Sequence, residues 1–91
     1  MADAIKISEQ DNVAVCLRSF KKNSRVSYYD QRELKSLVLA DDVDFGHKFA
    51  CRAIAKHANV IKYGSVIGEA TGDIAEGAHV HIHNVKSKRC E

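Results

Sequence analysis

The chain has 91 residues, of which 45% are hydrophobic and 29% are charged, and it contains no proline. This length predicts one domain spanning residues 1–91, and this composition excludes a disordered or collagen-like chain. Fourteen Lys and Arg against twelve Asp and Glu give a net charge of +2, too small to indicate a nucleic-acid-binding face without a basic cluster.

No apolar stretch approaches the ~20 residues that cross a bilayer, so no membrane association is expected. Residues 1–10 include Asp3 and Glu9 and do not resemble a secretory leader. The three cysteines lack CxxC spacing and are expected to be reduced thiols, which favours a cytoplasmic location. The last residues, 85–91, are predicted to be a solvated basic tail that carries Lys86, Lys88 and Arg89.

Two segments in the first third of the chain have the composition of strands. Residues 12–17 are apolar and rich in small or β-branched side chains, which predicts a buried strand. Residues 24–29 follow a polar break at residues 21–23, so the two strands are predicted to form a hairpin around it. In residues 30–42, Asp30 and Glu33 resemble the start of a helix, although residues 37–39 also suit a strand. Local signals alone favour the helix.

One turn pattern recurs in residues 42–49 and 73–80, and more weakly in residues 53–60. The two stronger copies have a branched apolar residue, a glycine three residues later and a second apolar residue three positions after the glycine. Gly46 and Gly77 are expected to adopt a positive φ that strains other residues. His57 takes the glycine position in the weaker copy, which predicts a left-handed conformation at a cost of about 1 kcal/mol.

Residues 60–70 predict two short strands about a turn at Gly64 and Ser65. Gly68 lies within the second strand and predicts a bulge or the close approach of another backbone. Together with the turns, this pattern predicts a mostly β, small, single-domain, barrel-like fold. Its small core and strand edges favour self-association into a homo-oligomer.

The segment from His79 to Asn84 carries most of the chemistry in the sequence. Read as a strand, it places Val80 and Ile82 on the inner face and the three histidines on the outer face. Neighbouring histidines then stand ~6.6 Å apart, so His79 and His81 could converge on one metal ion, whereas all three would span ~13 Å. The alternative is a polar outer face that happens to use histidine.

Two other groups of residues are weaker candidates. His47 and Lys48 follow the glycine of the first turn, and Lys62 precedes a tight turn, so the lysines could bind a carboxylate as point charges or could simply be solvated. Cys16 and Cys51 fall on apolar stretches and are expected in the core rather than as nucleophiles. The common nucleotide-binding and hydrolase motifs are absent.

These segments together resemble one family over nearly the whole chain, most closely from residue 46 to residue 84. It is the altronate dehydratase family, in its small subunit or N-terminal domain. The segments that carry the resemblance are residues 11–15, 46–50, 59–64, 67–68 and 79–84. The resemblance implies a SAF-type β-clip fold and, against the local signals, a strand at residues 34–39 paired near Val26. The sequence departs from the family at His57, which replaces a turn glycine, and in residues 21–41, which match poorly.

The same resemblance implies a hydro-lyase that converts altronate to 2-dehydro-3-deoxy-gluconate and water, with iron (Fe²⁺) as the usual metal. We expect this chain to close over an active site that a large partner subunit carries, with the iron held mainly by that partner. In that role we expect His81 and His83 to be catalytic, His79 and His81 to be metal ligands, and Asn84, His47, Lys48 and Lys62 to bind the substrate.

Three alternatives stay open at this point. A galactarate dehydratase or a sulfolactate sulfo-lyase small subunit would share the same pattern. SAF-type domains also serve as non-catalytic binding or assembly modules, because a fold alone does not determine chemistry. A free-standing metal carrier is the third alternative.

Overall fold

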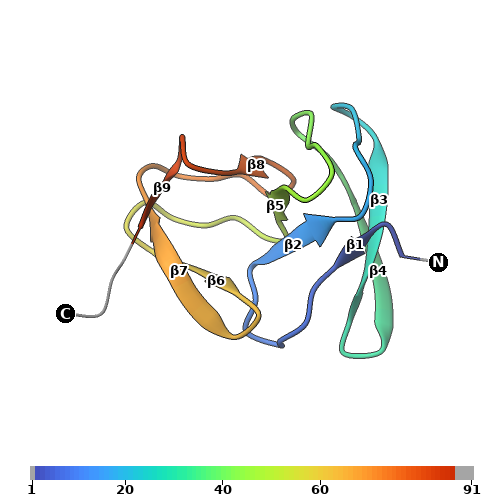
Figure 1. The fold of residues 1–91 in the computed structure, drawn as a ribbon, viewed down its shortest axis with the longest axis horizontal. Helices are drawn as coiled ribbons and strands as arrows, with labels where there is room; N and C mark the ends of the chain where they lie inside the picture. Colours follow the sequence, from blue (N-terminus) through green and yellow to red (C-terminus); the bar gives the residue numbers. More distant parts are fainter. Residues whose placement is uncertain (1, 88–91) are drawn as a thin grey trace.

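The computed structural model describes residues 2–87, which form nine strands in two sheets and contain no helix (Figure 1). The six-stranded sheet has the order β4-β3-β1-β2-β5-β8, and the three-stranded sheet has the order β6-β7-β9. The predicted mostly β fold is therefore confirmed. The predicted basic tail of residues 85–91 is wrong for its first three residues, because residues 85–87 form strand β9 and pair with β7; Lys88, Arg89 and Cys90 lie outside the described residues. The strands are β1 Ala4–Ile5, β2 Val13–Cys16, β3 Arg25–Asp30, β4 Glu33–Val38, β5 Lys48–Ala50, β6 Asn59–Lys62, β7 Ser65–Ala70, β8 His79–Val80 and β9 Val85–Ser87.

Strands β3 and β4 form a hairpin where local signals favoured a helix. Val26 pairs with Leu37, and both side chains are buried, so the strand implied by the family resemblance is correct. Gln31 and Arg32 both have positive φ, as a tight two-residue hairpin turn requires. Asp30 forms ion pairs with Lys6 and Lys35 instead of capping a helix. Long-range pairing and ion pairs thus override the local helix signal.

The predicted hairpin between β2 and β3 is wrong, because β1 lies between these two strands. Strand β1 pairs antiparallel with β2 and parallel with β3. The local pattern of residues 12–29 is compatible with either arrangement, and the two-residue strand β1 is too short to be detected by periodicity.

The recurring turn is present four times, once more than the sequence pattern indicated. In each copy a bridge-forming residue is followed, three positions later, by a residue with φ between 74° and 85°. The additional copy begins at Phe20, with Asn23 in the glycine position, and the left-handed conformation predicted for His57 is confirmed. The bridges join the copies in two pairs, Phe20 with Val43 and Ile54 with Ile74.

The strands β2 and β5 lie between two hydrophobic cores. Because side chains alternate along a strand, Ala14 and Phe49 pack into the first core, and Val13 and Ala50 pack into the second. Cys16 and Cys51 are buried, as predicted; burial raises the pKa of Cys16 to about 11 and that of Cys51 to about 12. These thiols therefore stay protonated at neutral pH and do not act as nucleophiles.

Asp11 and Asn12 join the two sheets. The buried carboxylate of Asp11 accepts hydrogen bonds from the backbone N–H groups of Ile7, Ser8 and Gly64. The side chain of Asn12 donates to the carbonyl of Asn59 and accepts from the N–H of Ile61, both in β6. The loop before β2 is thereby fixed against β6 and against the β6–β7 turn.

The β6–β7 hairpin is present as predicted, but its turn lies one residue earlier, at Tyr63 and Gly64 instead of Gly64 and Ser65. A Cβ atom on Gly68 would lie 2.5 Å from Val85 Cγ1 and 2.6 Å from the carbonyl oxygen of Lys86, so β9 approaches the backbone at Gly68 closely, as predicted. The register also shifts within the β6–β7 pair, between Val60 and Ile61.

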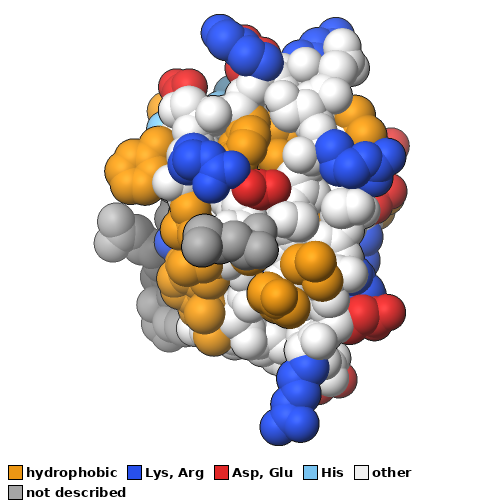
Figure 2. All heavy atoms as spheres, turned by 90° about the vertical axis from the view of Figure 1, so that its right-hand side faces the viewer, with side chains coloured by type: hydrophobic (Ala, Val, Ile, Leu, Met, Phe, Trp, Pro, Cys, Tyr) orange, Lys and Arg blue, Asp and Glu red, His pale blue; other side chains and the backbone are white. Residues whose placement is uncertain are grey.

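The outer surface is mixed in character. Figure 2 shows the face that carries β3 and β4, where hydrophobic side chains are interspersed with charged ones. Tyr29 and Leu34 pair across this hairpin, and each is about half exposed. Self-association through a strand edge stays a prediction. No helix among the described residues is long and apolar enough to cross a membrane.

The hydrogen-bonded carboxylate of Asp11 should make the stability of the fold depend on pH. Burial alone would raise the pKa of Asp11, but the hydrogen bonds that its carboxylate accepts from surrounding backbone N–H groups lower the pKa below its ordinary value. The ionised form therefore stabilises the fold above pH ~3.8, and this contribution is lost as the pH falls through the folded-state pKa. Asp11→Asn should lower the free energy of unfolding at pH 7 by about 2–3 kcal/mol, measured by urea denaturation. The deficit relative to wild type should shrink below pH ~3.8, whereas Asp44→Asn, at an exposed turn position, should show no such pattern.

Gly46 and Gly77 have nearly the same φ but different surroundings, so replacing each with alanine distinguishes the cost of backbone strain from the cost of a steric clash. Gly46→Ala adds a Cβ with no neighbour within 4 Å, so only the positive φ opposes it, at a cost of about 1–2 kcal/mol. Gly77→Ala places the Cβ 2.5 Å from the carbonyl oxygen of Val38 and should cost about 1–3 kcal/mol more. Equal thermal destabilisation of the two variants would contradict this assignment.

Candidate metal and anion site

The predicted histidine strand ends earlier than expected. Strand β8 comprises only His79 and Val80, and the chain then turns through residues 81–84 before β9 begins at Val85. Val80 is buried as predicted, but Ile82 is 84% exposed, so the prediction that it faces inward is wrong. Alternation along a strand applies only while the strand continues, and this one stops after two residues.

The turn gathers histidines from two segments that are 32 residues apart in the sequence. The rings of His47, His79 and His81 stack with centroids 4.4–5.5 Å apart, and His47 Nδ1 lies 2.9 Å from His79 Nε2. One ligand nitrogen from each ring lies within 4.8 Å of the others. We call these three residues the histidine cluster.

Strand pairing explains how His47 joins the cluster. His47 follows the positive-φ residue Gly46 and directly precedes β5, which pairs antiparallel with β8. That register places Phe49 opposite His79 and Lys48 opposite Val80. The sequence pattern favours His79 and His81 as metal ligands and places His47 among the substrate-binding residues. The missing signal was the β5–β8 pairing, which local patterns do not reveal.

His83 lies beside the cluster but is not part of it. Its ring centroid is 5.2 Å from that of His79, and its side chain is exposed. The expected 13 Å separation along a straight strand does not apply, because the turn folds the segment back. His83 is thus the histidine of this segment most open to solvent.

Burial and nearby charges favour the neutral form of two members of the cluster, His79 and His81. Burial, followed by the charges of His83, His47 and His81, lowers the pKa of His79 below its ordinary value of 6.5. Burial lowers the pKa of His81 too, followed by His47, Lys48 and His83. Neutral imidazoles keep a lone pair available, which is the form that binds metals.

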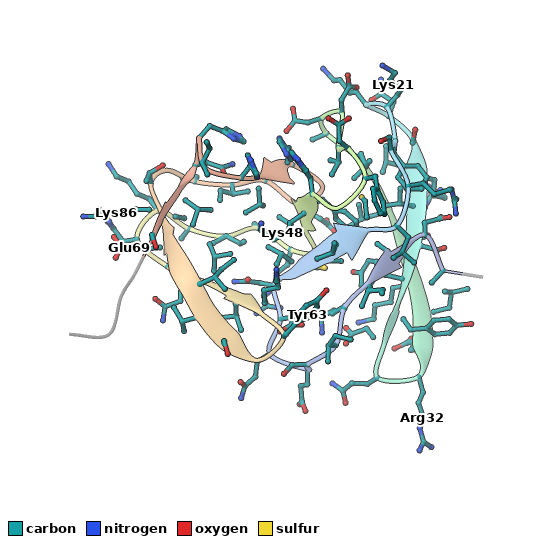
Figure 3. All side chains as sticks on the ribbon, in the orientation of Figure 1. Lys21, Arg32, Lys48, Tyr63, Glu69 and Lys86 are labelled. Carbon is teal, nitrogen blue, oxygen red and sulfur yellow. The ribbon has the colours of Figure 1, made fainter. Side chains whose placement is uncertain are left out.

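A hollow of about 190 Å³ opens next to the cluster. Lys48, which is half buried, contributes the positive charge in its lining, and burial followed by the charge of Lys62 lowers the pKa of Lys48. Among residues 2–87, no carboxylate forms an ion pair with Lys48. Figure 3 shows Lys48 in the central part of the molecule, above the Tyr63 turn. The hollow is lined by Lys48, Ile67, His81, Ile82, Val85 and Ser87.

The other two predicted substrate-binding residues occupy different positions. Lys62 does not line the hollow, and its Nζ lies 5.1 Å from the ring centroid of Tyr63. The side chain of Asn84 donates to the carbonyl of His79 and accepts from the N–H of His81. Direct contact between either residue and a substrate stays a prediction.

The sequence of this chain is similar to known proteins over nearly its whole length. Residues 2–88 match the family described as altronate/galactarate dehydratase SAF domain. The altronate dehydratase of Escherichia coli (strain K12) is 51% identical over 83 residues, which cover 91% of this chain and 16% of that enzyme. The altronate dehydratase of Bacillus subtilis (strain 168) is 40% identical over 87 residues, or 96% of this chain and 17% of that enzyme.

A third relative has a different length. The (2R)-sulfolactate sulfo-lyase subunit alpha of Chromohalobacter salexigens is 43% identical over 60 residues, which cover 66% of this chain and 64% of that subunit. The chain thus spans about one sixth of the altronate dehydratases but most of a small lyase subunit. With nearly its whole length matched, the chain belongs to the family of SAF domains found in altronate and galactarate dehydratases.

Proposed function

We propose that this chain is the small domain or subunit of a hydro-lyase that removes water from altronate to give 2-dehydro-3-deoxy-gluconate. The observation that carries the proposal is the histidine cluster, whose member His81 lines the same hollow as Lys48, a lysine with no ion-pair partner among residues 2–87. A metal-binding group and a carboxylate-binding group side by side match what this elimination requires.

The reaction needs three kinds of group. A base removes the proton from the carbon next to the carboxylate, a positive centre stabilises the resulting enolate, and an acid protonates the departing hydroxyl so that it leaves as water. The enol product then becomes the 2-oxo acid. Lys48 is placed to bind the substrate carboxylate, because its amine is half buried and has no acidic partner among the described residues.

The histidine cluster fits a divalent metal by its donor set. Imidazole nitrogen suits Fe²⁺, and three protein ligands leave coordination positions open for a substrate. With metal–nitrogen bonds of ~2.1 Å, ligand atoms lie ~3.0–3.4 Å apart, so the widest pair, now within 4.8 Å, must approach on binding. We assign His47, His79 and His81 to Fe²⁺, which would act there as a Lewis acid. On this assignment the chain would supply three ligands to the iron, and the partner would supply only the other protein ligands.

Of the two predicted catalytic histidines, His81 belongs to the cluster and His83 lies outside it. The exposed ring of His83 is therefore our candidate for moving a proton to or from the substrate. Its 5.2 Å ring separation from His79 keeps it within reach of a molecule bound at the cluster.

A larger polypeptide would complete the site. The chain covers only 16–17% of the altronate dehydratases, and the apolar lining of the hollow includes Ile82, which is 84% exposed. Covering this side chain would remove apolar surface from water and enclose the reaction. The second candidate function is a sulfo-lyase small subunit, favoured by the 64% coverage of the sulfolactate enzyme's subunit alpha.

Metal binding can be tested on the 91-residue chain itself. Anaerobic titration calorimetry with Fe²⁺ should give one site per chain, and His47→Ala, His79→Ala or His81→Ala should each abolish it or weaken it by at least ~100-fold. The matched control is His57→Ala, because His57 is an exposed histidine that contacts Glu69 and is not among the clustered ligand groups of the described residues. Equal binding by the control and all three cluster variants would contradict the assignment.

Activity can be tested with the chain assembled with its large partner and supplied with altronate, galactarate or sulfolactate. His83→Gln should lower kcat by about 10²–10⁴-fold if the ring transfers a proton. Lys48→Met should mainly raise KM, because it removes the carboxylate contact, whereas Lys21→Met at an exposed peripheral turn (Figure 3) should change neither constant. Unchanged turnover in both site variants would instead favour a non-catalytic module.

A further inference from the structure

We infer that Asp41 and Asn84 are positioning residues that hold the backbone of the histidine cluster in place for the metal. The inference rests on the proposed function, since it concerns the same cluster. Among the described residues, neither side chain belongs to the group of candidate metal ligands. Each one accepts a hydrogen bond from the backbone N–H of a cluster histidine, Asp41 from His79 and Asn84 from His81.

Asn84 closes the turn that follows β8. Its side-chain Oδ1 accepts from the N–H of His81 at 2.9 Å, and its Nδ2 donates to the carbonyl of His79 at 2.8 Å. Its own N–H donates to the carbonyl of His81, and its carbonyl accepts from the N–H of Thr71, directly after β7. One residue therefore links both turn histidines to the three-stranded sheet.

Asp41 holds the other side of the same segment. Strand β8 is at the edge of the six-stranded sheet, and the N–H of His79 donates to Asp41 Oδ2 at 2.9 Å. The preceding residue, Ala40, donates its N–H to the carbonyl of Gly77, so residues 40–41 run beside residues 77–79. This bond fixes the direction from which His79 enters the cluster.

The recurring turn does not by itself require either contact. Its own acids form a different bond: Asp42 accepts from the N–H of Lys22, and Asp73 accepts from the N–H of Lys56. Asp41 lies two residues before Val43, the bridge-forming residue of its turn copy. In the copy whose bridge-forming residue is Ile74, the same position is Gly72, which has no side chain. The Asp41 and Asn84 contacts are therefore specific to the histidine segment rather than part of the repeated scaffold.

The expected consequence is a change in metal binding without loss of the fold. Groups that orient metal ligands typically change metal affinity by ~10–100-fold, because the ligands must otherwise be ordered at the moment of binding. Asp41→Ala and Asn84→Ala should each weaken binding by about tenfold. Asp41→Asn keeps an oxygen acceptor for the N–H of His79 and should restore most of the affinity.

The experiment uses Co²⁺ with the full 91-residue chain, because its visible absorption reports the arrangement of its ligands as well as its affinity. The variants are Asp41→Ala, Asp41→Asn, Asn84→Ala and Asn84→Asp, the last of which keeps the acceptor for His81 but loses the donor to His79. The matched control is Asp73→Ala, which removes the same kind of carboxylate-to-backbone bond, but one made to the N–H of Lys56 instead of a cluster histidine. Thermal unfolding of each variant establishes that it is folded.

Weakened Co²⁺ binding with an altered spectrum in Asp41→Ala and Asn84→Ala, and wild-type behaviour in Asp73→Ala, would support the inference. If wild type binds Co²⁺ and the two alanine variants match it in affinity and spectrum, the inference is overturned while the metal site stands. An equal loss in Asp73→Ala would also overturn it, by showing general loosening. If wild type does not bind Co²⁺, the proposed metal site itself fails. Should an alanine variant not fold, Asn84→Asp decides instead, because it loses the donor to His79: weakened Co²⁺ binding with an altered spectrum supports the inference, and wild-type affinity and spectrum overturn it.

Discussion

The buried carboxylate of Asp11, with the adjacent amide of Asn12, fixes the two sheets relative to each other. Asp11 accepts from three backbone N–H groups, including that of Gly64 in the β6–β7 turn. The side-chain amide of Asn12 donates one hydrogen bond to the backbone of β6 and accepts another from it. A charge without solvent is stable only when such donors surround it, so the loops around Asp11 have little freedom to move apart. The two separate hydrophobic cores are connected through this junction and through β2 and β5.

The candidate site depends on that junction because both sheets contribute to it. The histidine cluster and Lys48 come from the β5 and β8 side of the six-stranded sheet, whereas Ile67 and Val85 line the hollow from the three-stranded sheet. A shift between the sheets would widen the hollow and separate Lys48 from Lys62. The chemistry proposed for this domain thus requires the two sheets to keep a fixed position relative to each other.

The sequence was sufficient for the fold class, the β6–β7 hairpin, the close approach at Gly68 and the left-handed conformation of His57, because each has a local signal. It was insufficient where pairing over long distances decides the structure. The helix signal at Asp30 gave way to ion pairs with Lys6 and Lys35, and only the family resemblance indicated the β3–β4 hairpin. Likewise, the grouping of His47 with His79 follows from β5–β8 pairing, and the early end of β8 follows from the Asn84 contacts, neither of which has a periodic signature.

The four turns also indicate how a new chemical group can be introduced into such a scaffold. The residue after the positive-φ position has its N–H bonded within the turn in every copy, whatever its side chain: Ser24, His47, Ala58 and Ala78. Three of these side chains are small, and the fourth supplies a ring to the cluster. Because the turn depends on main-chain geometry at this position, the turn itself accepts different side chains there. Ala58 and Ala78 pack against the second core, so Ser24 is the natural starting point for building a second reactive centre on this framework.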